Sequence, residues 1–262
     1  MESVKYNIYP SILDAFQDYL NSEDVWLRYW GGSDEPSMSL EDFEQKQFSG
    51  LIDKINRVPI AWEDSEKVDA GTTFNEIVDC LILNRNSDKM QIVKEFDSLD
   101  ENKVVAIRAI YNGRSFQFPL TVCREFSDYY KGAIPQVYTE AVLQTKYGSV
   151  KLYGYIDELM PTSIHDIKVT GSYEAWKFKD KWQRVVYPYC INENGSNITD
   201  FEYNILLYKA TKAGYNTYEV FAEYYNYTDD DKDRLTVFVE QFIEFLEENR
   251  NLITDKKIFN EL

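Results

Sequence analysis

Cysteine, histidine and positive charge are all scarce in this sequence of 262 residues. The three cysteines (Cys80, Cys123 and Cys190) are scattered and odd in number, so they form no metal or cluster motif and are typical of a reducing cytoplasm. Lysine and arginine number 28 against 45 aspartates and glutamates, and the formal net charge is −17. This charge argues against sequence-blind adhesion to nucleic acid, which needs a positive surface, but it leaves room for a local basic groove.

Long apolar runs and nucleotide-binding motifs are also lacking. No apolar run approaches the roughly 18 residues of a membrane span, and the first residues do not show a basic segment followed by an apolar one. We therefore expect a cytoplasmic protein with no membrane partner. Because no G-x-x-x-x-G-K-[ST] motif is present, any unwinding of nucleic acid would need another chain.

The residues that are present predict one α/β domain. Hydrophobic residues make up 44% and aromatic residues 16% of the chain, which is enough for a well-formed core. The order of helical and strand patterns predicts a mixed β-sheet flanked by helices. We expect a helical N-terminal region over residues 1–66, packed on a core domain over residues 67–262 as one compact unit, with a helix at the C-terminal end.

Periodicity and capping residues predict the individual elements. Helices are expected from an N-cap at Ser11, from residue 39 or 40 to 55, from Asp69, over 120–131, over 173–187, and after an N-cap at Thr228. Strands are expected over 103–111, 114–119, 135–145, 150–157, 164–169, 201–209 and 218–225, with a turn at 211–214 and an exposed charged connection over 84–103.

The central hairpin carries the strongest chemical signal. Gly154-Tyr-Ile-Asp157 ends one strand, residues 160–163 form a turn, and the next strand contains Asp166 and Lys168. Side chains alternate along a strand, so Asp166 and Lys168 share one face while His165 lies on the other. Two aspartates on adjacent strands can hold a divalent cation with a lysine beside it. The alternative is an ordinary hairpin, since Asp and Lys are common near turns.

The segment after the hairpin combines basic and aromatic residues. Gln183 and Tyr187 are four residues apart, so they share one face of the expected helix. The most basic patch of the chain lies here and either binds nucleic acid or is a solvated helix flank; it comprises Lys177, Lys179, Lys181 and Arg184.

These motifs, in this order, resemble the PD-(D/E)XK nuclease superfamily, within it the RecB-like branch that includes phage and CRISPR-associated exonucleases. Gly71 through Asn75-Glu76 is similar to the branch's first motif, a Gly followed four residues later by His. Gly154 to Asp157 resembles its G-x-x-D, Asp166 to Lys168 its (D/E)-x-K, and Gln183 to Tyr187 its Q-x-x-x-Y. The resemblance covers roughly residues 70–210 and implies a restriction-endonuclease-like core.

The resemblance also implies a site and a substrate. Asp157, Asp166 and the backbone carbonyl of Ile167 would bind Mg²⁺ or Mn²⁺, and Glu76 and Glu140 are candidates to complete the metal shell. Lys168 would position or deprotonate the attacking water, while Gln183 and Tyr187 would line the site. The basic patch would hold the DNA backbone, and Trp176 or Trp182 could stack on a base, although a place in the core is the favoured interpretation. We expect DNA and a recombination or helicase protein as partners, and no iron–sulfur cluster.

One departure leaves three functions open. Asn75 stands where the motif has His, and an amide binds metal weakly and cannot act as a base. The first function is a metal-dependent DNA nuclease, an exonuclease in recombination, repair or phage DNA processing. The second is a catalytically weak or inactive nuclease fold that binds nucleic acid or protein. The third is an acidic protein that engages the basic surface of a nucleic-acid enzyme.

Overall fold

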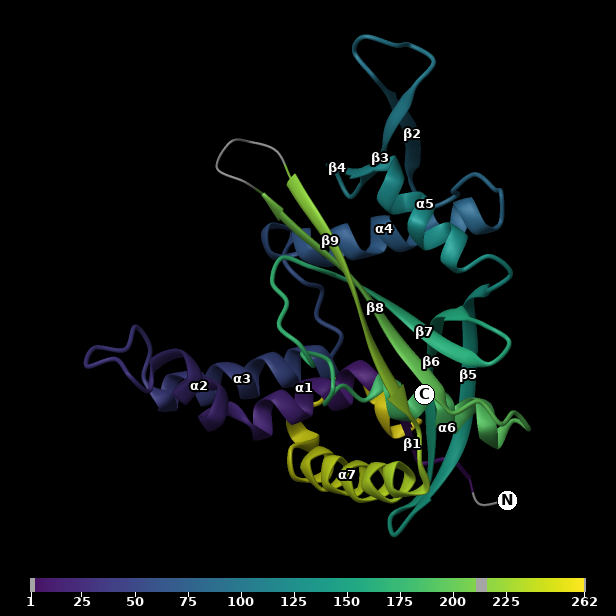
Figure 1. The fold of residues 1–262 in the computed structure, drawn as a ribbon. Helices are drawn as coiled ribbons and strands as arrows, with labels where there is room; N and C mark the ends of the chain where they lie inside the picture. The colour runs from purple at the N-terminus through teal and green to yellow at the C-terminus, as the bar shows by residue number, and fades with distance from the viewer. Residues whose placement is uncertain (1–2, 211–215, 262) are drawn as a thin grey trace.

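A computed structural model describes residues 3–210 and 216–261, in which helices flank a central mixed sheet of six strands (Figure 1). This confirms the predicted α/β fold class. The helices are α1 (Pro10–Leu20), α2 (Ser22–Trp30), α3 (Leu40–Ile55), α4 (Glu66–Ile82), α5 (Leu120–Tyr129), α6 (Gln183–Glu193) and α7 (Asp229–Glu248). The strands are β1 (Tyr6–Ile8), β2 (Gln91–Phe96), β3 (Val104–Tyr111), β4 (Arg114–Pro119), β5 (Ile134–Thr145), β6 (Gly148–Leu159), β7 (Ser163–Thr170), β8 (Asp200–Ala210) and β9 (Asn216–Asn226). Three short 3-10 turns lie at Trp62–Asp64, Arg250–Leu252 and Lys256–Phe259.

Strand β6 organises the central sheet because two different strands share one of its edges. Along the other edge it pairs with β5 in antiparallel fashion over almost its whole length. On the shared edge, β1 pairs in parallel with residues 150–152, and β7 pairs only with Glu158 and Leu159. Residues 153–157 of this edge have no strand partner in the part of the chain that the structure describes. Beyond β7, the sheet continues with β8 in parallel and β9 in antiparallel pairing.

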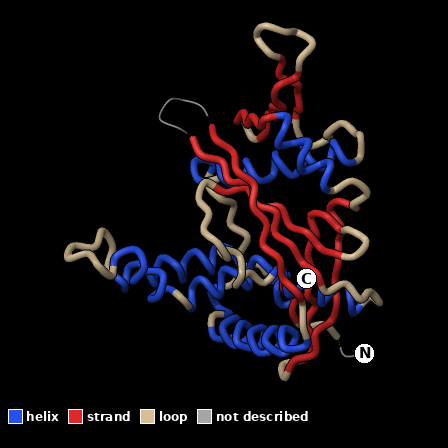
Figure 2. The backbone as a smooth tube through the Cα atoms, in the orientation of Figure 1, coloured by secondary structure: helices blue, strands red, loops and turns tan. Residues whose placement is uncertain are grey.

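Two hydrophobic cores hold the layers together. The first joins α1, α3, α6 and α7 with β1, β5, β6 and β8. The second joins α4 and α5 with the small antiparallel sheet β2-β3-β4, and takes in Ile167 of β7 and Leu206 of β8. Figure 2 shows the long strands β8 and β9 extending from the region of the first core to that of the second. Because Ile164 belongs to the first core and Ile167 to the second, β7 lies between them.

Local sequence signals explain several helix starts. Ser39 accepts a hydrogen bond from the Asp42 N–H at the start of α3. Thr228 and Asp231 form a reciprocal capping box at the start of α7, which confirms the predicted N-cap. The apolar stripe of α7, including Leu235 and Phe242, is fully buried in the first core. Among the described residues, no helix combines the length and apolarity needed to cross a membrane.

The structure corrects the sequence prediction near the N-terminus and in the small sheet. Residues 6–8 form strand β1 rather than helix, and the N-cap of α1 is Tyr9 rather than Ser11, with Pro10 as the first helical residue. The expected connection over 84–103 contains strand β2, and α4 begins at Glu66, three residues before Asp69. Short strands carry little periodicity, so whether such a segment forms a strand depends on the strands with which it can pair. The predicted turn at 211–214 lies outside the described residues.

A second correction concerns the segment before α6. The helix begins at Gln183, while residues 173–182 form successive turns rather than the predicted helix. The backbone N–H of Phe178 donates to Glu223 at 3.1 Å and that of Trp182 donates to Asp14 at 2.8 Å. Trp176 has a positive φ of 66°. Tertiary partners therefore take N–H groups that a helix would have used.

Candidate active site

The candidate site lies where β6 and β7 separate. Their ladder ends at the pair Glu158 and His165, so the N–H of Ile167 has no carbonyl of β6 opposite it. Asp157 Oδ2 accepts a hydrogen bond from this N–H at 2.9 Å. The carboxylate of Asp157 thus occupies the gap between the strands and is fixed against β7.

Asp166, Lys168 and Gln183 form a closed hydrogen-bonded network. Lys168 Nζ lies 2.6 Å from Asp166 Oδ2 and donates to Gln183 Oε1 at 2.6 Å. Gln183 Nε2 donates in turn to Asp166 Oδ1 at 2.5 Å. Asp166 is 2% exposed, whereas the Lys168 side chain is 25% exposed. The predicted sharing of one face by Asp166 and Lys168 is confirmed, and the lysine retains access to solvent.

Tyr187 completes the wall of the site one helical turn after Gln183. Gln183 Nε2 lies 3.5 Å from Tyr187 Oη, as expected for residues four apart on a helix. The Tyr187 ring lies directly on β6 at Gly154: a Cβ placed on this glycine would be 2.7 Å from Tyr187 Cε1. Glycine at position 154 therefore allows α6 to pack closely enough for Gln183 to reach Asp166.

We expect Gly154→Ala to destabilise the protein by about 1–3 kcal/mol, because the added methyl group overpacks a buried ring that cannot swing away. Gly71→Ala is the matched control: a Cβ at Gly71 meets nothing within 4 Å, and the change should stabilise helix α4 by about 0.5–1 kcal/mol. Urea unfolding of both variants measures the difference. Equal stability of the two variants would contradict the close contact between β6 and α6.

Burial and like charge set the protonation of the two aspartates. Burial, followed by the neighbouring Asp166 carboxylate, raises the pKa of Asp157 to about 7. Burial also raises the pKa of Asp166, against the opposing effect of Lys168. Burial alone would lower the pKa of Lys168, but Asp166 and Asp157 raise it overall, so the ammonium stays charged. The site therefore holds a permanent cation beside two carboxyl groups whose pKa values are both raised.

Helix α4 presents Asn75 and Asp79 to the site, not Glu76. Asn75 Nδ2 donates to Asp157 Oδ2 at 3.2 Å, while the buried Asn75 Oδ1 has no hydrogen-bond partner among the described residues. Asp79, four residues later on the same helix face, lies against the buried Glu158 of β6. Neither Asp79 nor Glu158 was predicted from the sequence, although the spacing from Asn75 points to Asp79.

The two further metal ligands implied by the resemblance do not join this cluster. Glu76 is ion-paired with Arg85 at 2.7 Å and Lys89 at 2.8 Å. Burial would raise the pKa of Glu76, but these partners lower it to about 2. Glu140 pairs in register with Tyr153, four residues and thus roughly 13 Å from Asp157 along the strand. Its carboxylate accepts a hydrogen bond from the Tyr138 hydroxyl at 2.6 Å.

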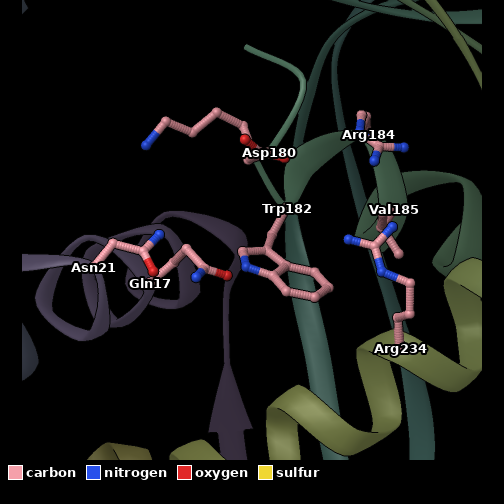
Figure 3. A pocket seen from close by; sticks show the side chains of 8 residues that line it. Gln17, Asn21, Asp180, Trp182, Arg184, Val185 and Arg234 are labelled. Carbon is pink, nitrogen blue, oxygen red and sulfur yellow. The ribbon is translucent and has the colours of Figure 1, made fainter. Parts of the chain in front are cut away.

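The predicted basic patch is divided between different surroundings. Arg184 lies 3.6 Å from Asp231, and Lys181 lies 3.5 Å from Asp18. Both line a hollow of about 310 Å³ next to Trp182, which Figure 3 shows between α1 and α7. Trp182 is 5% exposed and stacks on Phe238, so it belongs to the core, whereas Trp176 is exposed. Lys179 is exposed, and Lys177 turns toward the end of β7.

His165 lies away from the carboxylates, as the strand alternation predicts. Its Nε2 pairs with Ser163 Oγ at 2.7 Å and its Nδ1 with Asn204 Oδ1 at 3.1 Å. The ring packs edge-on against Tyr129 and Tyr130 of α5. Burial, in spite of Asn204 and Glu202, lowers its pKa, so this histidine is a neutral residue of the interior at neutral pH.

Comparisons with known proteins give matches among solved structures alone. No protein-family model and no curated protein matches it. Among solved structures, the fold is similar to the crystal structure of SSO0001, with a TM-score of 0.41 and 11% identity over 94% of this chain and 79% of that one. It is also similar to a protein from Eubacterium rectale named "Putative exonuclease", with a TM-score of 0.34 and 17% identity over 51% of this chain and 53% of that one.

Proposed function

We propose that this protein is a metal-dependent nuclease that hydrolyses phosphodiester bonds of DNA, acting as an exonuclease in recombination, repair or phage DNA processing. The observation that carries this proposal is the convergence of Asp157, Asp166 and Lys168 at the gap between β6 and β7. The ordered motifs that resemble the PD-(D/E)XK superfamily support the same reaction.

The oxygen donors at the gap suit a hard divalent cation. Asp157 and Asp166 supply carboxylates, and the buried Asn75 Oδ1 lacks a partner beside them. Across the described residues there is no group of three His, Cys, Asp or Glu side chains that could hold a metal ion. Mg²⁺ or Mn²⁺ would therefore be held by these two aspartates together with neutral oxygens, for which the Ile167 carbonyl and Asn75 are the candidates.

When bound, the ion would supply acidity to a coordinated water and polarise the scissile phosphate. Lys168 has three N–H donors, of which Asp166 and Gln183 take two, so one remains for a substrate oxygen or the attacking water. Because the pKa of Lys168 is raised, the side chain acts as a fixed positive charge and donor rather than as a general base. Gln183 is a positioning residue that orients both Lys168 and Asp166.

A nuclease fold without turnover is the second candidate, and the motif position held by Asn75 favours it. The amide donates its N–H to Asp157, which leaves one fewer acidic or imidazole ligand than the motif would supply. Such a protein would bind nucleic acid or a recombination partner without cleaving the strand. Digestion products would distinguish the two functions.

We expect Asp157→Asn to weaken Mn²⁺ binding at least about 10-fold and to stop DNA digestion, since even groups that only support a metal ligand are worth about 10–100-fold in affinity. Glu140→Gln is the matched control: it removes one carboxylate from the same sheet but should leave both properties unchanged. Calorimetric titration with MnCl₂ and digestion of linear DNA in Mn²⁺ or EDTA measure them. Unchanged Mn²⁺ affinity of Asp157→Asn, or digestion in EDTA, would refute the proposed function.

A further inference from the structure

A cationic cavity of about 740 Å³ opens at the end of β7. It is separate from the candidate active site, which we call the carboxylate cluster (Asp157, Asp166 and Lys168). Three lysines from three separate elements line it: Lys67 from the first turn of α4, Lys177 from the turns before α6, and Lys209 from β8. The remaining lining residues are Val169, Thr170, Gly171, Ser172 and Tyr208. No carboxylate is among these lining residues, although the protein carries a net charge of −17.

The three lysines are not neutralised by local ion pairs. None of them forms a salt bridge with any residue in the described ranges 3–210 and 216–261. Partial burial lowers the pKa of Lys177, and the nearby charge of Lys67 acts in the same direction, against the carboxylates of Glu174 and Glu223. Positive charge therefore accumulates around an open cavity, an arrangement that attracts anions.

The rim of the cavity is held in place by hydrogen bonds. Lys177 Nζ donates to Thr170 Oγ1 at 3.1 Å and to the Ser172 carbonyl at 2.6 Å. Thr170 Oγ1 donates in turn to the Ser172 carbonyl at 2.9 Å. The half-buried ring of Tyr208 forms part of the wall. The positive charge held at this rim attracts phosphate oxygens, and an aromatic wall suits the face of a base.

Two elements connect this cavity with the carboxylate cluster. Strand β7 carries Lys168 at the cluster and Thr170 at the cavity, two residues or roughly 7 Å apart. Helix α4 carries Asn75 at the cluster and Lys67 at the cavity, eight residues or roughly 12 Å apart. A nucleic-acid chain that enters the cluster can therefore continue into the cavity within a few nucleotides.

We propose that the cavity bounded by Lys67, Lys177 and Lys209 binds the phosphate backbone of a single nucleic-acid strand whose scissile bond lies at Asp157 and Asp166. This proposal rests on the proposed nuclease function and adds the path of the strand beyond the reacting phosphate. It relocates the predicted nucleic-acid contacts, because only Lys177 of the original basic patch faces this cavity.

The test is binding of a fluorescent single-stranded DNA 20-mer in EDTA, where no metal-dependent cleavage occurs. We expect the triple variant K67A/K177A/K209A to lower the affinity at least about 10-fold and to reduce the slope of log K against log salt by about 2, because each single-strand phosphate contact contributes about 0.7. The triple variant K46A/K94A/K131A removes the same charge from exposed sites elsewhere and should bind like wild type.

The outcomes separate this proposal from the nuclease function. If the first triple variant keeps the affinity and salt slope of wild type, or if wild type does not bind the 20-mer, the cavity proposal is overturned. Retained binding by K67R/K177R/K209R would show that charge, rather than misfolding, explains the loss. Wild-type protein that binds the 20-mer in EDTA but does not cleave DNA in Mn²⁺ would contradict the nuclease function and leave the binding of the strand by the cavity standing.

Discussion

Replacing Lys168 with alanine is expected to lower the rate of metal-dependent DNA cleavage by about 100- to 1000-fold, the usual effect of removing one donor that stabilises developing negative charge. Lys168 is the cation that bonds to Asp166 and Gln183 at the site, and its raised pKa keeps it charged at neutral pH. The variant should remain folded, because protonation of the Asp157 and Asp166 pair can relieve the charge left behind.

Lys151→Ala is the control for this experiment. Lys151 lies on β6 in the same sheet and is similarly exposed, and its Nζ lies 3.7 Å from Glu140 and 5.8 Å from the centre of the Tyr153 ring. Its rate of cleavage should match wild type. Initial rates on linear DNA in Mg²⁺ or Mn²⁺, with circular dichroism to confirm folding, decide the result. Equal rates for Lys168→Ala and wild type would remove Lys168 from the reaction and with it the main support for the nuclease function.

Replacing Glu158 with glutamine is expected to stabilise the protein at alkaline pH by about 2–4 kcal/mol. Glu158 is completely buried beside Asp79, and this raises its pKa from 4.5 to about 9. When Glu158 and Asp79 are both ionised, neither oxygen of Glu158 accepts a hydrogen bond from any of the described residues. A single proton held between Glu158 and Asp79 supplies that missing bond, and a glutamine side chain supplies it without a proton.

The free energy of unfolding should fall as the pH rises, because folding raises the pKa of Glu158. Between about pH 4.5 and pH 9 the unfolded chain has released the Glu158 proton and the folded chain still holds it, so stability falls by about 1.4 kcal/mol per pH unit. Glu158→Gln should flatten this slope, whereas Glu140→Gln at an exposed site should change stability by less than about 0.5 kcal/mol. Urea unfolding in EDTA at pH 6 to pH 9 measures both; a slope equal to that of wild type would disprove the shared proton.

The helix repeat alone could not predict which of Glu76 and Asp79 faces the site. The resemblance implied Glu76 of α4 as a candidate metal ligand, and Asp79 was not among the expected site residues. In the folded chain Arg85 and Lys89 form ion pairs with the Glu76 carboxylate, while Asn75 donates to Asp157 and Asp79 lies against Glu158. Periodicity defines which residues share a face, but the rotation of α4 about its axis depends on its packing against the second core.

Strand and helix repeats in the sequence were enough to predict which side chains of the site share a face of β7 or of α6. Alternation along β7 placed Asp166 beside Lys168 and turned His165 away, and the spacing of Gln183 and Tyr187 placed both on one side of α6, because these relations depend only on strand and helix repeats. Long-range pairing in the folded chain places β1 and β7 on one edge of β6 and leaves a gap for Asp157. Tertiary contacts also explain why residues 173–182 form turns instead of a helix, and why Lys177 lines the same cavity as Lys67 and Lys209. These relations depend on pairing and packing between residues far apart in the chain, which no local repeat encodes.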